Sequence, residues 1–325
     1  MRTSSRERDG RKVGVVGVGA VGQACAFALV LRGSCREIVL VDRTAARATA
    51  VATDMRYGAP LSPTVEITGG GDWGELAGAG VVLICSGVNE KGGGATDRDD
   101  PRGRLKLLDT NASVYRDVVP RIVAAAPDAV LVAVTDPPDP LADLTRTLAG
   151  HDRVLSTGTT IDTLRFRVHI AAQLGVHPSA IEGLVVGEHG TSEVMLWSSV
   201  RVAGTSLADA LSLRDPGGSV DDLREQVERE VRFANIAIIE GNDASQFGIG
   251  VACSRIAEAV LGDERIVMPV AAYRERYGVT IGLPTVVGRE GAAGEFEPRM
   301  SDEEGRAFER SVATLRDAAG VLSSG

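Results

Sequence analysis

The first half of the chain alternates short apolar runs with segments of helical periodicity. The apolar runs are rich in Val, Ile and Leu and lie at 12–17, 37–42, 81–87 and 129–135. Helical patterns cover 20–33 and 104–126. Nearly continuous apolar strands of this kind are typical of a parallel sheet that is buried on both faces. Because parallel crossovers are right-handed, the pattern predicts a doubly wound α/β domain over residues 12–150.

The second half has a more mixed pattern. The stretch VLSTGTT (154–160) leads into a helical segment. Apolar runs that predict strands lie at 181–187 and 195–204, and the run at 279–291 predicts a strand or a hairpin. Helical periodicity covers 162–175, 219–240, 245–261 and 301–319. This order predicts a mixed α+β domain over residues 151–325, with a boundary near residue 150.

Two segments do not fit either regular pattern. NEKGGGATDRDDPRG (89–103) is rich in glycine and charge, so it predicts a long exposed lid loop over about 88–104. The N-terminal residues 1–11 are polar and lack the apolar core of a secretory signal, so they are interpreted as a loose tail.

Composition narrows the class of protein. The 325 residues carry a net charge of −9, which argues against a nucleic-acid partner. No run approaches the roughly 20 apolar residues that a membrane span requires. The cysteines show no CxxC spacing, so neither a metal site nor a disulfide framework is expected, and free thiols fit a cytoplasmic protein; they are Cys25, Cys35, Cys85 and Cys253.

A glycine-rich turn joins the first strand to the first helix. It reads Gly17-Val18-Gly19-Ala20-Val21-Gly22, the GxGxxG pattern in the position where a dinucleotide pyrophosphate approaches a helix N-terminus. Asp42 ends the next strand, where its carboxylate can accept ribose hydroxyls and repel a 2′-phosphate. The sequence therefore predicts a dinucleotide-binding domain that prefers NAD to NADP.

Three ionisable residues in the second half are candidates for chemistry. His189 follows an apolar run in GEHGTSEV, where it is either a solvated turn histidine or an acid/base at the mouth of a cleft. Asp162 and Arg165 share one face of a predicted helix, either as an ordinary ion pair or as groups facing a cleft. An arginine facing a cleft could bind a substrate carboxylate through two hydrogen bonds.

These motifs together resemble the L-lactate/malate dehydrogenase family over residues 12–320. The shared segments occur in the family's order, namely GVGAVG, Asp42, RLKLLDTN (104–111), TDPPDP (135–140), STGTTIDTLRFR (156–167), GEHGTSEV (187–194) and LPTVVGREG (283–291). The resemblance implies NAD-dependent oxidation of an L-2-hydroxy acid to its 2-oxo acid by a homodimer or homotetramer. It also implies that Ser86, Gly87 and Asn111 contribute to the NAD site.

The same resemblance assigns roles to the candidate residues. His189 would be the acid/base, and Asp162 would stabilise its imidazolium. Arg165 would bind the substrate carboxylate. Arg104 would match the lid arginine that polarises the carbonyl, because RLKLLxxN keeps the family spacing to Asn111.

The chain departs from the family around the substrate. Asp136 stands where the family usually has asparagine, and an ionised carboxylate cannot donate a hydrogen bond. The family's substrate-selecting lid position corresponds to Glu90 when aligned from the left and to Arg98 when aligned from the right. Ser245 best matches the pocket wall.

These departures leave the function open between three hypotheses. Glu90 and Asp136 predict an acidic pocket and a non-standard substrate, with pyruvate a poor one. Arg98 in the pocket would instead predict a plain malate dehydrogenase. A protein that has lost catalysis and serves as an NAD-binding sensor or scaffold is the alternative from another class.

Overall fold

An eight-stranded sheet forms the centre of the molecule. The computed structural model describes residues 11–63, 65–100 and 103–323. The strand order is β14-β13-β6-β5-β4-β1-β2-β3. The predicted parallel sheet is present and has six parallel strands, namely β1 (Lys12–Val16), β2 (Glu37–Val41), β3 (Glu66–Gly70), β4 (Val81–Ile84), β5 (Val130–Ala133) and β6 (Val154–Ser156). The antiparallel strands β13 (Ala271–Arg274) and β14 (Val279–Gly282) extend one edge.

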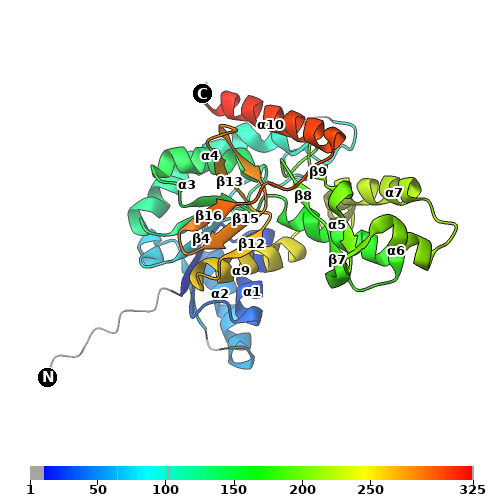
Figure 1. Ribbon diagram of the computed structural model, residues 1–325. Coiled ribbons are helices and arrows are strands. Elements are labelled where there is room, and N and C mark those ends of the chain that lie inside the picture. The colour runs from blue at the N-terminus through cyan, green and yellow to red at the C-terminus, as the bar shows by residue number, and fades with distance from the viewer. Residues whose placement is uncertain (1–10, 64, 101–102, 324–325) are drawn as a thin grey trace.

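Helices cover both faces of this sheet (Figure 1). One face packs on α1 (Ala20–Arg32), α2 (Ala45–Gly58) and α9 (Phe247–Leu261). The other packs on α3 (Leu108–Ala125), α4 (Pro138–Ala149) and the C-terminal α10 (Asp302–Ser323). Successive strand residues pack into the hydrophobic cores on opposite faces of the sheet. Ile38 and Leu40 lie in the core on the α1, α2 and α9 side, and Val39 and Val41 lie in the core on the other side. Both faces are apolar because both are covered, which confirms the predicted doubly wound arrangement.

Several elements of the first half differ from the predicted ones. The predicted helix 104–126 is a 3₁₀ turn, η3 (Gly103–Leu107), followed by α3. The helices α2 and α4, strand β3 and the 3₁₀ turns η1 (Ala59–Leu61) and η2 (Trp73–Leu76) were not predicted. Of the residues in α2, only Ala48 and Ala52 are buried, so the helix shows little amphipathic contrast in sequence.

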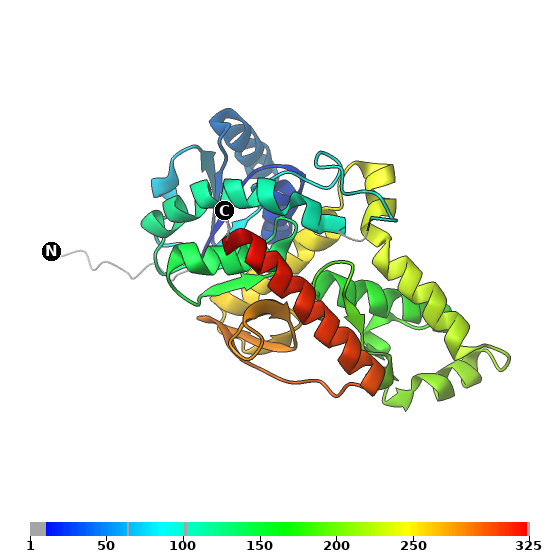
Figure 2. The same cartoon turned by 90° about the horizontal axis from the view of Figure 1, so that it is seen from above.

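The second half supplies a smaller mixed unit that projects to one side of the sheet (Figures 1 and 2). Its helices are α5 (Thr160–Leu174), α6 (Leu207–Arg214), α7 (Val220–Arg232) and α8 (Ala234–Asn242). Its short strands and turns are η4 (Pro178–Ala180), β7 (Ile181–Glu182), β8 (Val185–Val186), β9 (Val194–Met195), η5 (Trp197–Ser199), β10 (Arg201–Val202) and β11 (Thr205–Ser206). A separate three-stranded sheet is formed by β12 (Ile266–Met268), β15 (Thr285–Gly288) and β16 (Gly291–Glu295).

Two predicted strands of this half are broken. The run 181–187 forms β7 and β8, which pair with different partners, β10 and β9. The break lies at Gly183, where a Cβ would stand 3.0 Å from the ring of Phe166, so the chain passes tightly over α5. The run 195–204 is interrupted by η5, which turns Trp197 edge-on against Phe166 with 4.6 Å between ring centroids.

The main sheet also runs across the boundary expected near residue 150, because β6, β13 and β14 all follow that position. The domain division at 150 therefore stays a prediction. Of the expected N-terminal tail, residues 1–10 lie outside the described residues. Arg11 belongs to the fold, since its carbonyl accepts hydrogen bonds from the backbone N–H groups of Arg36 and Glu37. Within the described ranges, every helix is too short or too polar to span a bilayer.

Candidate active site

The glycine-rich turn lies between β1 and α1 and forms a cradle of exposed backbone. Gly17 has φ of 93°, and a Cβ there would stand 2.6 Å from the backbone nitrogen of Ser86. A Cβ on Gly22 would stand 1.9 Å from the carbonyl oxygen of Gly17. Gly19, the N-cap of α1, faces open space and carries no capping side chain. Gly17 and Gly22 allow the turn to form, because a side chain at either position would clash. Gly19 leaves the helix N-terminus open to an anion, which fits a dinucleotide pyrophosphate.

Asp42 lies directly beside this turn. Its carboxylate oxygens accept hydrogen bonds from the backbone N–H groups of Val18 at 2.7 Å and Thr44 at 2.8 Å. These bonds hold the carboxylate at the carboxyl ends of β1 and β2, with Ala20 and Val21 opening α1 next to it. Each oxygen keeps a further lone pair with which it can accept a ribose hydroxyl.

Asn111 clamps the start of the lid loop. Its side-chain oxygen accepts from the N–H of Val88 at 2.7 Å, and its amide donates to the carbonyl oxygens of Val88 and Asp136 at 3.0 and 2.6 Å. A Cβ on Gly87 would stand 2.4 Å from the Thr135 methyl, and Thr135 donates a hydrogen bond to the carbonyl of Ser86. The segment after β4 is therefore tied to the segment after β5.

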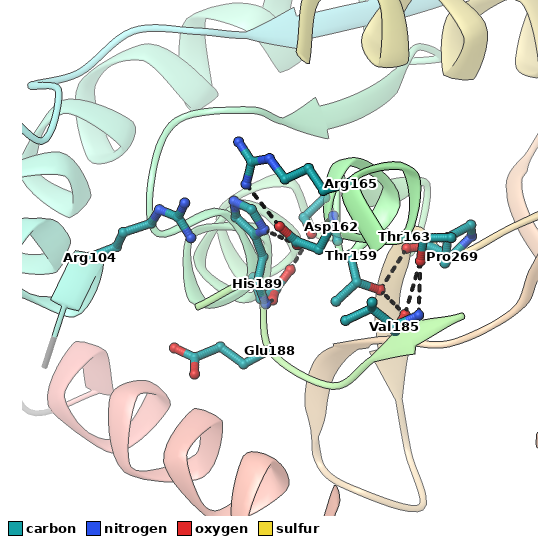
Figure 3. Close-up of polar contacts among 12 residues, drawn as sticks. Arg104, Thr159, Asp162, Thr163, Arg165, Val185, Glu188, His189 and Pro269 are labelled. Atoms are coloured by element: carbon teal, nitrogen blue, oxygen red, sulfur yellow. Dashed lines mark hydrogen bonds and ion pairs between the residues drawn. The ribbon is translucent and has the colours of Figure 1, made fainter. Parts of the chain in front are cut away.

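A histidine, an aspartate and an arginine meet at the N-terminal end of α5 (Figure 3). His189 Nδ1 lies 2.5 Å from Asp162 Oδ2, and Arg165 Nη1 lies 3.1 Å from the other oxygen of Asp162. Asp162 is in the first turn of α5, and His189 follows β8. Asp162 thus orients both the imidazole and the guanidinium, which leaves Nε2 of His189 as the nitrogen available for proton transfer.

The protonation of this group follows from its charges. Burial opposes ionisation of Asp162, but the charge and hydrogen bond of His189 and the charges of the two arginines together outweigh it and hold the pKa of Asp162 at about 2. Burial likewise opposes the imidazolium, but the Asp162 carboxylate raises the pKa of His189 above its usual value. The pair is therefore suited to keep a proton on His189 near neutral pH.

Sequence reasoning missed three polar residues around this group. The buried Asp139 accepts from the backbone N–H of His189 at 2.7 Å and from Ser156, and burial raises its pKa to about 7. Burial and the nearby Asp162 charge raise the pKa of Glu193 to about 8. Asn235 lines the cavity and hydrogen-bonds Glu90. The first two lie in quoted motifs, but no local pattern signalled that they are buried.

A second set of charges faces His189 from the lid side. Arg104 Nε lies 3.7 Å from Glu90 Oε1 and 3.6 Å from Asp136 Oδ1, and Asp136 Oδ1 lies 3.7 Å from His189 Nε2. In Figure 3 the Arg104 side chain reaches toward His189 from the opposite side to Arg165. One guanidinium is thus shared between two carboxylates.

These two carboxyl groups titrate in opposite directions. Burial and the neighbouring Glu90 charge raise the pKa of Asp136 to about 6, since the pull of Arg104 does not offset them. Burial opposes ionisation of Glu90 too, but there the Arg104 charge and the hydrogen bonds to the carboxylate together prevail, and the pKa of Glu90 is lowered. Glu90 is therefore the more firmly ionised of the two.

The two candidates for the substrate-selecting position, Glu90 and Arg98, lie in different surroundings. Glu90 is buried and lines the cavity. Arg98 instead makes a two-bond ion pair with Glu240 of α8, at 2.7 and 2.9 Å, where both side chains are about half exposed. Glu90 is the group that this structure brings beside His189, and Arg98 is not.

A cavity of about 50 Å³ joins both sets of charges. Ser245 forms part of its wall, with its hydroxyl 3.5 Å from Arg165 Nη2. The lining residues are Val21, Glu90, Arg104, Val134, Asp136, Thr157, Ile161, Arg165, His189, Asn235, Ser245 and Ile249. Because Val21 belongs to the glycine-rich turn, the cavity connects the cofactor cradle with the histidine.

Comparison with known proteins places this geometry in a family. Residues 11–155 match the lactate/malate dehydrogenase NAD-binding domain, and residues 159–320 match the lactate/malate dehydrogenase alpha/beta C-terminal domain. An L-lactate dehydrogenase of Deinococcus radiodurans is 44% identical over 94% of this chain and 97% of its own, and one of Thermus aquaticus is 40% identical over 96% and 99%. The crystal structure of a minor L-lactate dehydrogenase from Enterococcus mundtii is 31% identical and superimposes with a TM-score of 0.87 over 97% of this chain and 99% of its own. The chain belongs to the lactate/malate dehydrogenase family and is an NAD-dependent L-2-hydroxy-acid dehydrogenase.

Proposed function

We propose that His189 is the acid/base of this dehydrogenase, with Asp162 and Arg165 as its partners. The 2.5 Å contact between His189 Nδ1 and Asp162 carries the proposal, because it orients the ring and leaves Nε2 beside the cavity. Bound NAD would supply the nicotinamide that exchanges a hydride with C2 of the substrate. In the direction of reduction, His189 Nε2 gives its proton to the carbonyl oxygen, and in oxidation it takes the proton from the hydroxyl.

The two arginines divide the substrate between them. Arg165 is oriented by Asp162 and can bind the substrate carboxylate through both terminal nitrogens. Although burial opposes its charge, the carboxylates of Asp136 and Glu90 raise the pKa of Arg104, so its guanidinium stays charged and can polarise the carbonyl. The glycine turn and Asp42 form the NAD side, and the charge of Asp42 disfavours a 2′-phosphate.

The alternatives gain less support. The malate dehydrogenase hypothesis requires Arg98 in the pocket, whereas its guanidinium is paired with Glu240 on α8. The sensor or scaffold hypothesis gives no reason for Arg104, Asp162, Arg165 and His189 to meet around one cavity.

A screen of 2-oxo acids with NADH, followed by loss of absorbance, tests the proposal. Turnover of any of them excludes the scaffold hypothesis. His189→Asn should lower kcat by about 10²–10⁴-fold, the contribution of a positioned proton donor. NADH binding by the variant, measured by fluorescence titration, should stay near that of the wild type. A variant with near-wild-type kcat would show that another group transfers the proton.

We also propose that the enzyme is a homodimer or homotetramer in the cytoplasm. Large apolar side chains of α1, α2, η1 and α9 are exposed and line one hollow, namely Phe27, Leu31, Tyr57, Leu61 and Phe247. Such a patch suits a second copy of the chain. The four cysteines are free thiols, which suits a reducing compartment. Light scattering of the wild type and of Leu61→Glu tests the assembly, since a variant with unchanged mass would remove this surface from consideration.

A further inference from the structure

We propose that the pocket selects L-2-hydroxy acids and 2-oxo acids whose side chain ends in a cationic hydrogen-bond donor, such as an ammonium group bound by Glu90. The inference rests on the proposed function, because it assumes that Arg165 and His189 place the carboxylate and C2. It concerns only the part of the substrate that extends from C2 toward the lid.

Arg104 Nε forms no hydrogen bond to either of the two lid-side carboxylates, Glu90 and Asp136. It lies 3.6 Å from Asp136 and 3.7 Å from Glu90, which is beyond hydrogen-bond distance. Among the described residues, this buried Nε has no hydrogen-bond partner. Arg104 therefore attracts both carboxylates through its charge without forming a short ion pair to either through Nε.

The charges facing the cavity do not balance. Glu90, Asp136 and Asp162 are acidic, whereas Arg104 and Arg165 are the only arginines that line it or touch these acids within the described residues. The substrate carboxylate adds another negative charge when it binds to Arg165. A proton on His189 compensates for one of these charges. At pH 8, where Asp136 with its pKa of about 6 is ionised, the negative charges still exceed the positive ones by one, and a cationic substrate balances them.

The order of the contacts places this charge on the side-chain end of the substrate. Asp136 Oδ1 lies 3.7 Å from His189 Nε2, whereas no ion pair joins Glu90 to His189 among the described residues, so Glu90 is the acid further from the reacting centre. Glu90 and Asp136 also contact each other, and this contact contributes to the opposite shifts of their pKa values. An ammonium group has three N–H donors and can satisfy both carboxylates at once. A substrate with a second carboxylate would add repulsion at the same place.

Three L-2-hydroxy acids of matched length test the inference. They are 4-amino-2-hydroxybutanoate, 2-hydroxypentanoate and 2-hydroxyglutarate, which place an ammonium, a methyl and a carboxylate at the same point of the chain. Oxidation with NAD at pH 8 should give kcat/KM in that descending order. The ammonium compound should exceed the methyl compound by at least about 10-fold, because a site built for a donor rejects an analogue that lacks it.

The matched variants are Glu90→Gln and Asp99→Asn. Glu90→Gln should reduce the ammonium-over-methyl ratio by about 10-fold or more. Asp99 is an exposed acid of the same lid and does not line the cavity, so Asp99→Asn should leave the ratio unchanged.

Each outcome decides a different claim. If the methyl or carboxylate compound is oxidised as well as the ammonium compound, the inference is wrong while the dehydrogenase mechanism stands. Equal losses of selectivity in both variants would also overturn it, because general lid charge would then explain the preference. If none of the three is oxidised and the 2-oxo acid screen also fails, the proposed function itself is wrong.

Discussion

Asp136→Asn is expected to stabilise the free enzyme more at neutral pH than at acidic pH. The carboxyl group is mostly buried, with 20% of the side chain exposed, and its pKa is raised to about 6 from an ordinary value of 3.8. Burial and the Glu90 charge thus outweigh the attraction of Arg104. The folded protein holds a proton on Asp136 that the unfolded chain has already released, so ionisation of this group favours unfolding.

The size of the effect follows from the shift. A difference of roughly 2 pKa units corresponds to about 3 kcal/mol of free energy of unfolding, at about 1.4 kcal/mol per unit. Below the unfolded pKa both states are protonated and the cost disappears. It grows as pH rises and is complete above pH 6. About 1.4 kcal/mol of the difference falls between pH 5 and pH 7.5.

Urea unfolding of the wild type and Asp136→Asn at these two pH values measures this difference. Both proteins are compared at one protein concentration, because assembly would stabilise the folded state. Asp99→Asn is the control, since its exposed carboxylate should show no such trend. If Asp136→Asn were less stable than the wild type at pH 7.5, Arg104 would outweigh burial, and our account of the raised pKa would be wrong.

Three further predictions test the site. Asp42→Ser should reduce the preference for NADH over NADPH in kcat/KM, because the carboxylate beside the glycine turn no longer opposes a 2′-phosphate; equal use of both cofactors by the wild type would contradict this. Asp162→Asn should lower the pKa of His189, so the pH above which 2-oxo acid reduction declines should move down; an unmoved profile would show that Asp162 does not support the imidazolium. Arg98→Gln should leave oxaloacetate reduction within a few fold, because Arg98 pairs with Glu240; a loss of orders of magnitude would favour the malate dehydrogenase hypothesis.

The sheet was predictable because its strands are buried on both faces. Residues 38–41 supply both cores in alternation, so the run is apolar throughout and is easily recognised. Helix α4 was missed because it begins in Pro138-Asp139-Pro140, and prolines usually indicate a turn. Prolines in a first helical turn are tolerated, since the N–H groups there have no intrahelical partner.

The site was predictable only as far as its motifs are contiguous. The glycine turn, Asp162, Arg165 and His189 lie in short segments with a recognisable pattern. Asn235 lies in none, and it reaches the cavity because α8 packs across it. The burial of Asp139 depends on its contacts with Ser156 and His189, which are distant in sequence. Such contacts are set by tertiary packing and leave no local periodicity.

The choice between Glu90 and Arg98 shows how local backbone contacts settle what spacing leaves open. Asn111 binds both the N–H and the carbonyl of Val88, so the chain just before Glu90 is held to the end of β4. Past Glu90 the loop enters Gly92-Gly93-Gly94, whose residues are exposed, and no similar clamp of a side chain onto both backbone groups is seen for Arg98 among the described residues. Insertions in such a loop displace the residues beyond it and not those before it. These contacts therefore favour the alignment through the clamped side, and our proposal that the position facing the substrate is an acid rests on it.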